Sequence, residues 1–168
     1  MIIIGEKING AIPAVKAAIA ARDAEVIRQR AIAQTQAGAH YLDCAPSTAP
    51  EVEYDAMVWL IEQIQAISEL PVCIDSPNAK LLARILEEGH VHKPGMVNSV
   101  NEEGDKCETI FPLIAGTDWN VLGLTVGGDR TDLRSGRDPL RSEEKGRDRQ
   151  AHHRQGRPLR CQALQPPH

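Results

Sequence analysis

The sequence has few aromatic residues, no closely spaced cysteines and no long apolar run. Only five of its 168 residues are Trp, Tyr or Phe, and the formal net charge is −4. A nucleic-acid-binding protein usually presents a basic face, so that class is not favoured. No apolar stretch approaches the roughly 20 residues that a bilayer span requires, and the N-terminus lacks the layout of a secretory signal. These absences predict a cytoplasmic protein that contacts neither a membrane nor nucleic acid.

Cysteine and histidine give no sign of a metal centre. The four cysteines lie far apart in the sequence, with no CxxC pair: Cys44, Cys73, Cys107 and Cys161. This spacing predicts neither a zinc module nor a disulfide framework, and we expect free thiols. His90 and His92 follow the end of a predicted helix, where we expect a solvent-exposed loop rather than a pair of metal ligands. The sequence therefore predicts no metal site.

The composition of the chain changes abruptly after residue 125. Residues 1–125 hold 9 Lys and Arg against 17 Asp and Glu, whereas residues 126–168 hold 10 against 6. The second segment contains no Ile, Met, Phe, Tyr or Trp. Such a segment cannot bury enough apolar surface to offset the entropy lost on ordering it. We therefore predict a domain over residues 1–125 and a disordered or out-of-frame Arg-rich tail over residues 126–168.

Three interpretations of this tail are open: a functional basic segment, an ordinary linker or disordered segment, and an out-of-frame segment. A basic segment can bind nucleic acid or an acidic partner. The change, however, falls inside what reads as a strand and leads into Arg-, Gly-, Pro- and His-rich sequence without periodicity. A reading-frame shift in a GC-rich gene would produce this pattern, and it is the interpretation that we favour.

Apolar runs and helical periodicity alternate along the first 125 residues. Short apolar runs, several of them β-branched, predict strands over 1–5, 40–44, 72–74, 94–98 and 120–124. Periodic segments predict helices over 12–21, 24–37, 51–69, 79–88 and 102–115. Asp23 is a predicted N-cap and Gly38 a predicted C-cap. The apolar stripe of the third helix is expected to comprise Val52, Ala56, Leu60, Ile64 and Ile67.

Alternation of this kind predicts an α/β fold with a parallel sheet, because parallel neighbours require crossover connections. An open doubly wound sheet and a closed (β/α)8 TIM barrel both satisfy it. No GxGxxG fingerprint follows the first strand, so nucleotide binding lacks its usual support. Polar residues, in contrast, stand at the ends of consecutive strands, and a barrel brings those ends together at one mouth. They are Glu6, Asn9, Asp43, Asp75, Asn78, Asn98, Ser99 and Asn101.

Carboxylates and amides at one mouth suit a flat heterocycle with a polar edge. A carboxylate accepts two N–H bonds from an amino-pyrimidine edge, and an Asn amide offers a donor and an acceptor to ring atoms. Asp43 and Asp75 have an equally ordinary alternative. Each could cap the helix that follows it or bind backbone N–H groups.

Short motifs in a fixed order make the sequence similar to a known family. They are residues 3–9 (IIGEKIN), 38–43 (GAHYLD), 57–60 (MVWL), 72–78 (VCIDSPN), 96–101 (MVNSVN), 111–113 (FPL) and 122–125 (LGLT). In this order they resemble the methyltetrahydrofolate:corrinoid methyltransferases, whose fold is a pterin-binding TIM barrel. The resemblance covers residues 1–125 and implies the N-terminal part of a barrel, with about five strands.

The resemblance also implies a site and a reaction. Asp75 and Asn98 match the positions that hydrogen-bond the pterin ring of methyltetrahydrofolate, and Asp43, Glu6 and Asn9 match further positions at the mouth. The family moves the methyl group of 5-methyltetrahydrofolate to the cobalt of a corrinoid, a cobalamin-type cofactor carried by a separate corrinoid protein. Intact relatives are expected to be homodimers. No catalytic residue is assigned.

The chain departs from the family at two places. The family pattern LDxN reads Leu42-Asp43-Cys44-Ala45, so its Asn is absent. The resemblance ends at Thr125, before the last three strands of a barrel. We therefore expect weak pterin binding and no methyl transfer from this chain. The alternatives are a pterin enzyme similar to dihydropteroate synthase and a non-catalytic pterin-binding or interaction fragment. The sequence identifies neither the corrinoid partner nor the pathway.

Overall fold

The computed structural model describes residues 1–101 and 105–124. The predicted tail over residues 126–168 lies outside the described residues. Along the described part, strands alternate with helices: β1 (Ile4–Asn9), α1 (Pro13–Ala21), α2 (Ala24–Gln36), β2 (Tyr41–Ala45), α3 (Pro50–Gln65), β3 (Val72–Asp75), α4 (Ala79–Glu87), β4 (Met96–Val100), α5 (Lys106–Ile114) and β5 (Asn120–Gly123).

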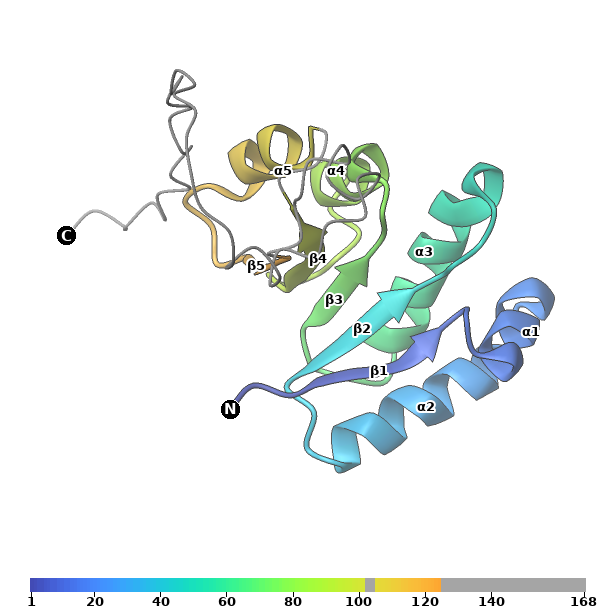
Figure 1. The fold of residues 1–168 in the computed structure, drawn as a ribbon. Coiled ribbons are helices and arrows are strands. Elements are labelled where there is room, and N and C mark those ends of the chain that lie inside the picture. Colours follow the sequence, from blue (N-terminus) through green and yellow to red (C-terminus); the bar gives the residue numbers. More distant parts are fainter. Residues whose placement is uncertain (102–104, 125–168) are drawn as a thin grey trace, which may run out of the picture. The chain divides into compact units, whose positions relative to one another are not determined.

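The strands form one parallel sheet in which neighbours in sequence are neighbours in space. Its order is β1-β2-β3-β4-β5, and every adjacent pair is parallel (Figure 1). A doubly wound sheet reverses its strand order at a switch point, whereas a barrel adds each strand beside the previous one. The described residues therefore have the arrangement predicted for the first part of a barrel.

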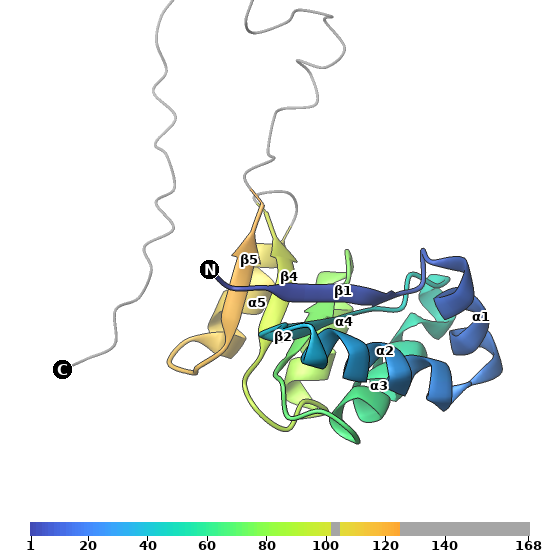
Figure 2. The ribbon, with the colours of Figure 1, turned by 90° about the horizontal axis from the view of Figure 1, so that it is seen from below.

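The core lies between the sheet and the helices. Across four strands, one row of side chains is completely buried: Ile8, Cys44, Ile74 and Val97. The buried face of α3, which lies alongside the sheet in Figure 2, packs in the same apolar cluster. Because burial of apolar area is the main driving force of folding, this layer fixes how the helices sit on the sheet.

The first strand begins later than predicted. Residues 1–5 were expected to form it, but β1 spans Ile4–Asn9, and Ile2 and Ile3 are 65% and 41% exposed. Pairing with β2 sets this position, because Ile4 lies opposite Tyr41 and Asn9 opposite Ala45. The prediction from the apolar composition of residues 1–5 placed the strand too early in the sequence. Consequently Glu6 and Asn9 lie within the strand and not in a loop after it.

A register shift occupies the middle of β1. It falls between Gly5 and Ile8, where the pairing with β2 is irregular. The side chain of Gln34 from α2 hydrogen-bonds the backbone of β1 at this point. Its Oε1 accepts a bond from the Lys7 backbone N at 2.7 Å. A Cβ on Gly5 would lie 2.7 Å from the same oxygen, so glycine is required for this close approach.

The predicted helix ends agree with the structure in most cases. Asp23 caps α2, and its Oδ1 accepts bonds from the backbone N of Glu25 and Val26 at 3.1 and 3.4 Å. Ala37 is the C-cap residue of α2, and Gly38 follows it with a φ of +87°. The left-handed conformation explains why glycine stands there.

The predicted apolar stripe of α3 is only partly buried. Ala56, Leu60 and Ile64 lie in the core, but Val52 is 51% exposed and Ile67 is 36% exposed. Ile67 follows the last residue of the helix, which ends at Gln65. The predicted stripe therefore extended beyond the buried face of α3 at both ends.

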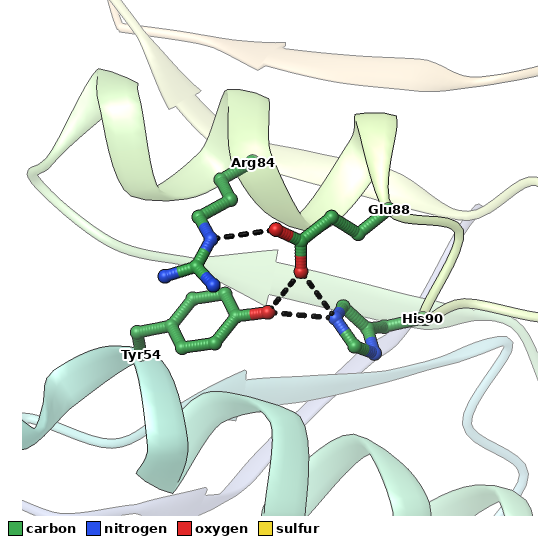
Figure 3. Close-up of polar contacts among 4 residues, drawn as sticks. All are labelled: Tyr54, Arg84, Glu88 and His90. Carbon is green, nitrogen blue, oxygen red and sulfur yellow. Dashed lines mark hydrogen bonds and ion pairs between the residues drawn. The ribbon is translucent and has the colours of Figure 1, made fainter.

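A polar cluster on the outer surface joins α3 to the end of α4 (Figure 3). The Tyr54 hydroxyl donates a hydrogen bond to Glu88, and its Oη lies 2.8 Å from His90 Nε2. Arg84 binds Glu88 through Nε at 2.7 Å and stacks on the Tyr54 ring. Hydrogen bonds from Tyr54, Arg84 and His90 lower the pKa of Glu88 to about 2. His90 lies in the predicted loop after α4 with a side chain that is 28% exposed, but hydrogen bonds to Tyr54 and Glu88 hold its ring, whereas His92 is exposed.

Within the described residues, no helix has the length and apolar character needed to cross a membrane.

We predict that Ile64→Ala lowers the free energy of unfolding by about 2–5 kcal/mol, because it leaves a cavity under α3. Ile64 is completely buried, whereas Ile67 is partly exposed beyond the helix. Ile67→Ala is the matched control and should cost less than about 1 kcal/mol. Urea unfolding followed by circular dichroism measures both variants. Equal losses would contradict the placement of the core.

Candidate functional site

Polar side chains gather on the face of the sheet that is turned away from the helices. Asp43 lies between Leu42 and Cys44, which both belong to the apolar core under the helices. Side chains alternate between the two faces along a strand, so Asp43 points to the opposite face. Asp75, the last residue of β3, is the register partner of Asn98 in the middle of β4. Parallel barrels build their sites at the carboxyl ends of their strands.

Asp43 and Asn98 form the centre of this site. Asn98 Nδ2 donates a hydrogen bond to Asp43 Oδ1 at 3.2 Å, and the Asp43 side chain is almost completely buried. Burial raises the pKa of Asp43, while hydrogen bonds from Asn98 and Cys73 act in the opposite direction. An ionised carboxylate only accepts hydrogen bonds, so the Asn98 amide group must turn its nitrogen toward Asp43. The Asn98 carbonyl oxygen is then presented as an acceptor on the open side.

Asp75 carries the most strongly shifted carboxyl group of the site. Burial, followed by the charges of Asp43 and Glu6, raises the pKa of Asp75 to about 6, and the positive charge of Lys106 opposes this. Three acidic side chains from β1, β2 and β3 thus act on one another across adjacent strands. Like charges held this close destabilise the fold, and such crowding is typical of a functional site.

Neither aspartate caps a helix. Helix α3 begins after Ala49 without a side-chain cap. Helix α4 is capped by Asn78, whose Oδ1 accepts bonds from the backbone N of Lys80 and Leu81 at 3.1 and 3.3 Å. The alternative that Asp43 and Asp75 are caps is therefore wrong, and the predicted mouth residue Asn78 has that structural role.

The two candidates on β1 differ from each other. Asn9 Oδ1 accepts bonds from the Ala11 backbone N at 2.8 Å and from Ser47 Oγ at 3.2 Å, so its oxygen is engaged by the neighbouring loops. The Asn9 nitrogen is the part of the amide that can face a ligand. Glu6 is exposed, and its charge raises the pKa of both Asp43 and Asp75.

Two residues at the site were missed by the sequence analysis. Lys106 opens α5, its Nζ donates to the Ser99 carbonyl at 3.2 Å, and its charge reaches Asp75. The predicted helix began at residue 102, which placed Lys106 inside it. Glu53 is 6% exposed although it is a glutamate on α3. Placing Val52 in the buried stripe assigned Glu53 to solvent, so the pattern held no signal for its burial.

The described cysteines differ in their surroundings. Cys44 and Cys73 are buried free thiols, the Cys107 Sγ donates to the Asn101 carbonyl oxygen at 3.3 Å, and Cys161 lies outside the described residues. Within the part of the chain that the structure describes, no three His, Cys, Asp or Glu side chains come together as metal ligands. What the site offers is a set of hydrogen-bonding groups in a fixed arrangement, which suits a planar ligand with a polar edge.

We predict that Asp75→Asn stabilises the protein at neutral pH. A raised carboxyl pKa means that the folded state binds the proton more tightly, so stability is lost as pH rises from about 4 through about 6. Because Asp75 is partly exposed, we expect a gain of about 1–2 kcal/mol at about pH 8 and almost none at about pH 4. Urea unfolding at both pH values measures it. The exposed Asp118→Asn is the control, and an equal gain there would contradict the crowding of charges.

Comparison with known proteins gives one consistent result. Residues 14–152 match the family described as pterin binding enzyme. The chain is 46% identical over 127 residues to the methylcorrinoid:tetrahydrofolate methyltransferase of Eubacterium limosum, a match that covers 74% of this chain and 46% of that protein. The chain thus spans less than half of the length of this relative. A match over most of the chain shows the family: the chain belongs to the pterin-binding enzymes.

Proposed function

We propose that this chain is part of a methyltransferase that moves a methyl group between tetrahydrofolate and the cobalt of a corrinoid. Two findings support the proposal. One is the methyltransferase activity for which the relative at 46% identity is named. The other, which carries the proposal, is the Asp43–Asn98 pair in the middle of β2 and β4, beside Asp75 at the carboxyl end of β3. The relative favours methyl transfer over condensation with p-aminobenzoate.

The site holds the polar edge of the pterin. In its ionised form Asp75 accepts N–H bonds from the amino-pyrimidine edge, and Asn98 offers its carbonyl oxygen to a ring donor. Asp43 orients Asn98 through the 3.2 Å bond and does not need to touch the ligand. Asn9 and Glu6 on β1 border the same mouth. Charge-assisted bonds of this kind give both affinity and orientation.

The transfer step requires charge control at the pterin nitrogen. When the methyl group leaves this nitrogen, the nitrogen must gain positive character, and in the reverse direction it gives up that charge. The relative's name places the methyl group on the corrinoid first, whereas the family resemblance of the sequence motifs implies a methyl group that starts on the folate. Both directions break and form the same two bonds. The acidic groups Glu6, Asp43 and Asp75 favour positive charge on the bound ring.

The corrinoid supplies the cobalt that exchanges the methyl group. We propose that a separate corrinoid protein carries it and docks over the mouth of the sheet. A cytoplasmic location and a homodimer in intact relatives belong to the same proposal. The domain over residues 1–125 with a disordered or out-of-frame tail is also a proposal. The family match continues to residue 152, so resequencing of the coding region is the direct test of the tail.

We predict that the 168-residue chain binds tetrahydrofolate weakly and that the affinity falls as pH drops below about 6. Protonated Asp75 can no longer accept two N–H bonds, which gives the sign of the pH dependence. Asp75→Ala and Asn98→Ala should weaken binding by about tenfold or more at about pH 8. Anaerobic isothermal titration calorimetry on samples checked by circular dichroism measures these values.

The control is Glu51→Gln, an exposed carboxylate on α3 outside the site, which should bind as the unaltered chain does. A folded chain that takes up no tetrahydrofolate at millimolar concentration would contradict the proposal. Binding that does not change in Asp75→Ala would place the pterin elsewhere. Methyl exchange with a methylated cobalamin, set against condensation with p-aminobenzoate, separates the two enzyme classes.

A further inference from the structure

A buried carboxylate lies directly behind the candidate site. Glu53, in the first turn of α3, is 6% exposed, and its Oε1 accepts a hydrogen bond from Ser76 Oγ at 2.7 Å. Ser76 is 1% exposed and follows Asp75, the last residue of β3. The Glu53–Ser76 hydrogen bond therefore joins α3 to the end of β3, next to Asp75, the carboxylate proposed to bind the ligand.

The Ser76 hydroxyl and backbone N each make hydrogen bonds that hold the end of β3 to its neighbours. Its hydroxyl donates to Glu53 and accepts from the Asn78 backbone N at 3.0 Å, so it cannot rotate without losing a bond. Its backbone N donates to the backbone carbonyl oxygen of Asn98 at 3.1 Å. Ser76 is thus bonded to α3, to the start of α4 and to β4. Asp75 and Asn98 stand on the two strands that this residue connects.

We propose that Glu53 is a positioning residue: acting through Ser76, it holds Asp75 and Asn98 in the relative placement that fits the pterin edge. This inference rests on the proposed function. Glu53 itself does not touch the ligand. The contacts run from Glu53 to Ser76, from Ser76 to the Asn98 backbone, and from the Asn98 side chain to Asp43.

The cost of burying Glu53 argues against a purely structural role. A buried carboxylate loses its hydration, and replacing a buried hydrogen-bonded pair such as Glu53 and Ser76 by apolar groups is often neutral or stabilising. The N-terminus of α3 offsets part of that loss, because a negative charge is favourable there. The negative charge of Glu53 also contributes to the raised pKa of Asp75. Glu53 is therefore coupled to the site both by contact and by charge.

The test compares three variants and a control for tetrahydrofolate affinity at about pH 8, where Asp75 is ionised. Glu53→Leu removes the acceptor for Ser76, and Ser76→Ala removes the bridge, so each should weaken binding by about tenfold. Glu53→Gln keeps an oxygen that accepts from Ser76 and should stay within about threefold. Glu51→Gln removes a charge from the same turn of α3 and should change nothing.

A second readout distinguishes positioning from stability. The titration of the Asp75 carboxyl carbon, followed by NMR, should move to lower pH in Glu53→Gln, because one neighbouring negative charge is gone, and should stay in place in Glu51→Gln. Urea unfolding of the double variant Glu53→Leu/Ser76→Ala, which removes the hydroxyl together with its acceptor, should show stability close to that of the unaltered chain, while its tetrahydrofolate affinity falls as in the single variants. A weaker binder that is no less stable supports a positioning role.

The outcomes separate this inference from the proposed function. If the unaltered chain binds and Glu53→Leu and Ser76→Ala bind equally well, the inference is overturned and the proposed function stands. If the folded unaltered chain does not bind, the proposed function fails. In that case the NMR titration of Asp75 is the remaining test of the inference. An unchanged Asp75 titration in Glu53→Gln overturns the coupling of Glu53 to Asp75.

Discussion

The register of β2, β3 and β4 is the constraint on which the rest of the site depends. Leu42 lies opposite Val72, and Asp75 lies opposite Asn98, so the buried row and the polar row alternate in phase on all three strands. A shift of one residue on any strand would move an acidic or amide group into the core under the helices. Apolar packing against α3 and α4 prevents such a shift, and the same packing thereby aligns the polar groups on the other face.

This alignment has a cost in stability. Asp43 is almost completely buried, and burial together with neighbouring acidic groups raises the pKa of Asp75 to about 6. Only Asn98, Cys73 and the charge of Lys106 offset the crowding among the groups described. The apolar layer supplies the free energy that makes this arrangement tolerable. A ligand with several N–H donors would relieve the repulsion between these negative charges.

The sequence was sufficient for the order of elements and for three candidate residues that the structure brings together. Alternation gave the parallel sheet, and Asp43, Asp75 and Asn98 were predicted because each stands near the end of an apolar run. The start of β1 was wrong because Ile2 and Ile3 are apolar but unpaired, and only the register with β2 reveals that. Glu53 and Lys106 could not be predicted, because their places depend on tertiary packing that a helical pattern does not record.

In the proposed function, recognition of the pterin edge and transfer of the methyl group make separate demands on the fold. Asp75 and Asn98 come from adjacent strands, and direct hydrogen bonds through Ser76 and Asp43 set their relative positions. Their arrangement therefore does not depend on groups far along the sheet. The proposed transfer, in contrast, needs the proposed corrinoid protein to bring the cobalt to the methyl-bearing nitrogen. On this proposal, the local network from α3 to β4 holds the edge of the ring in place while the other side of the ligand stays open to that partner.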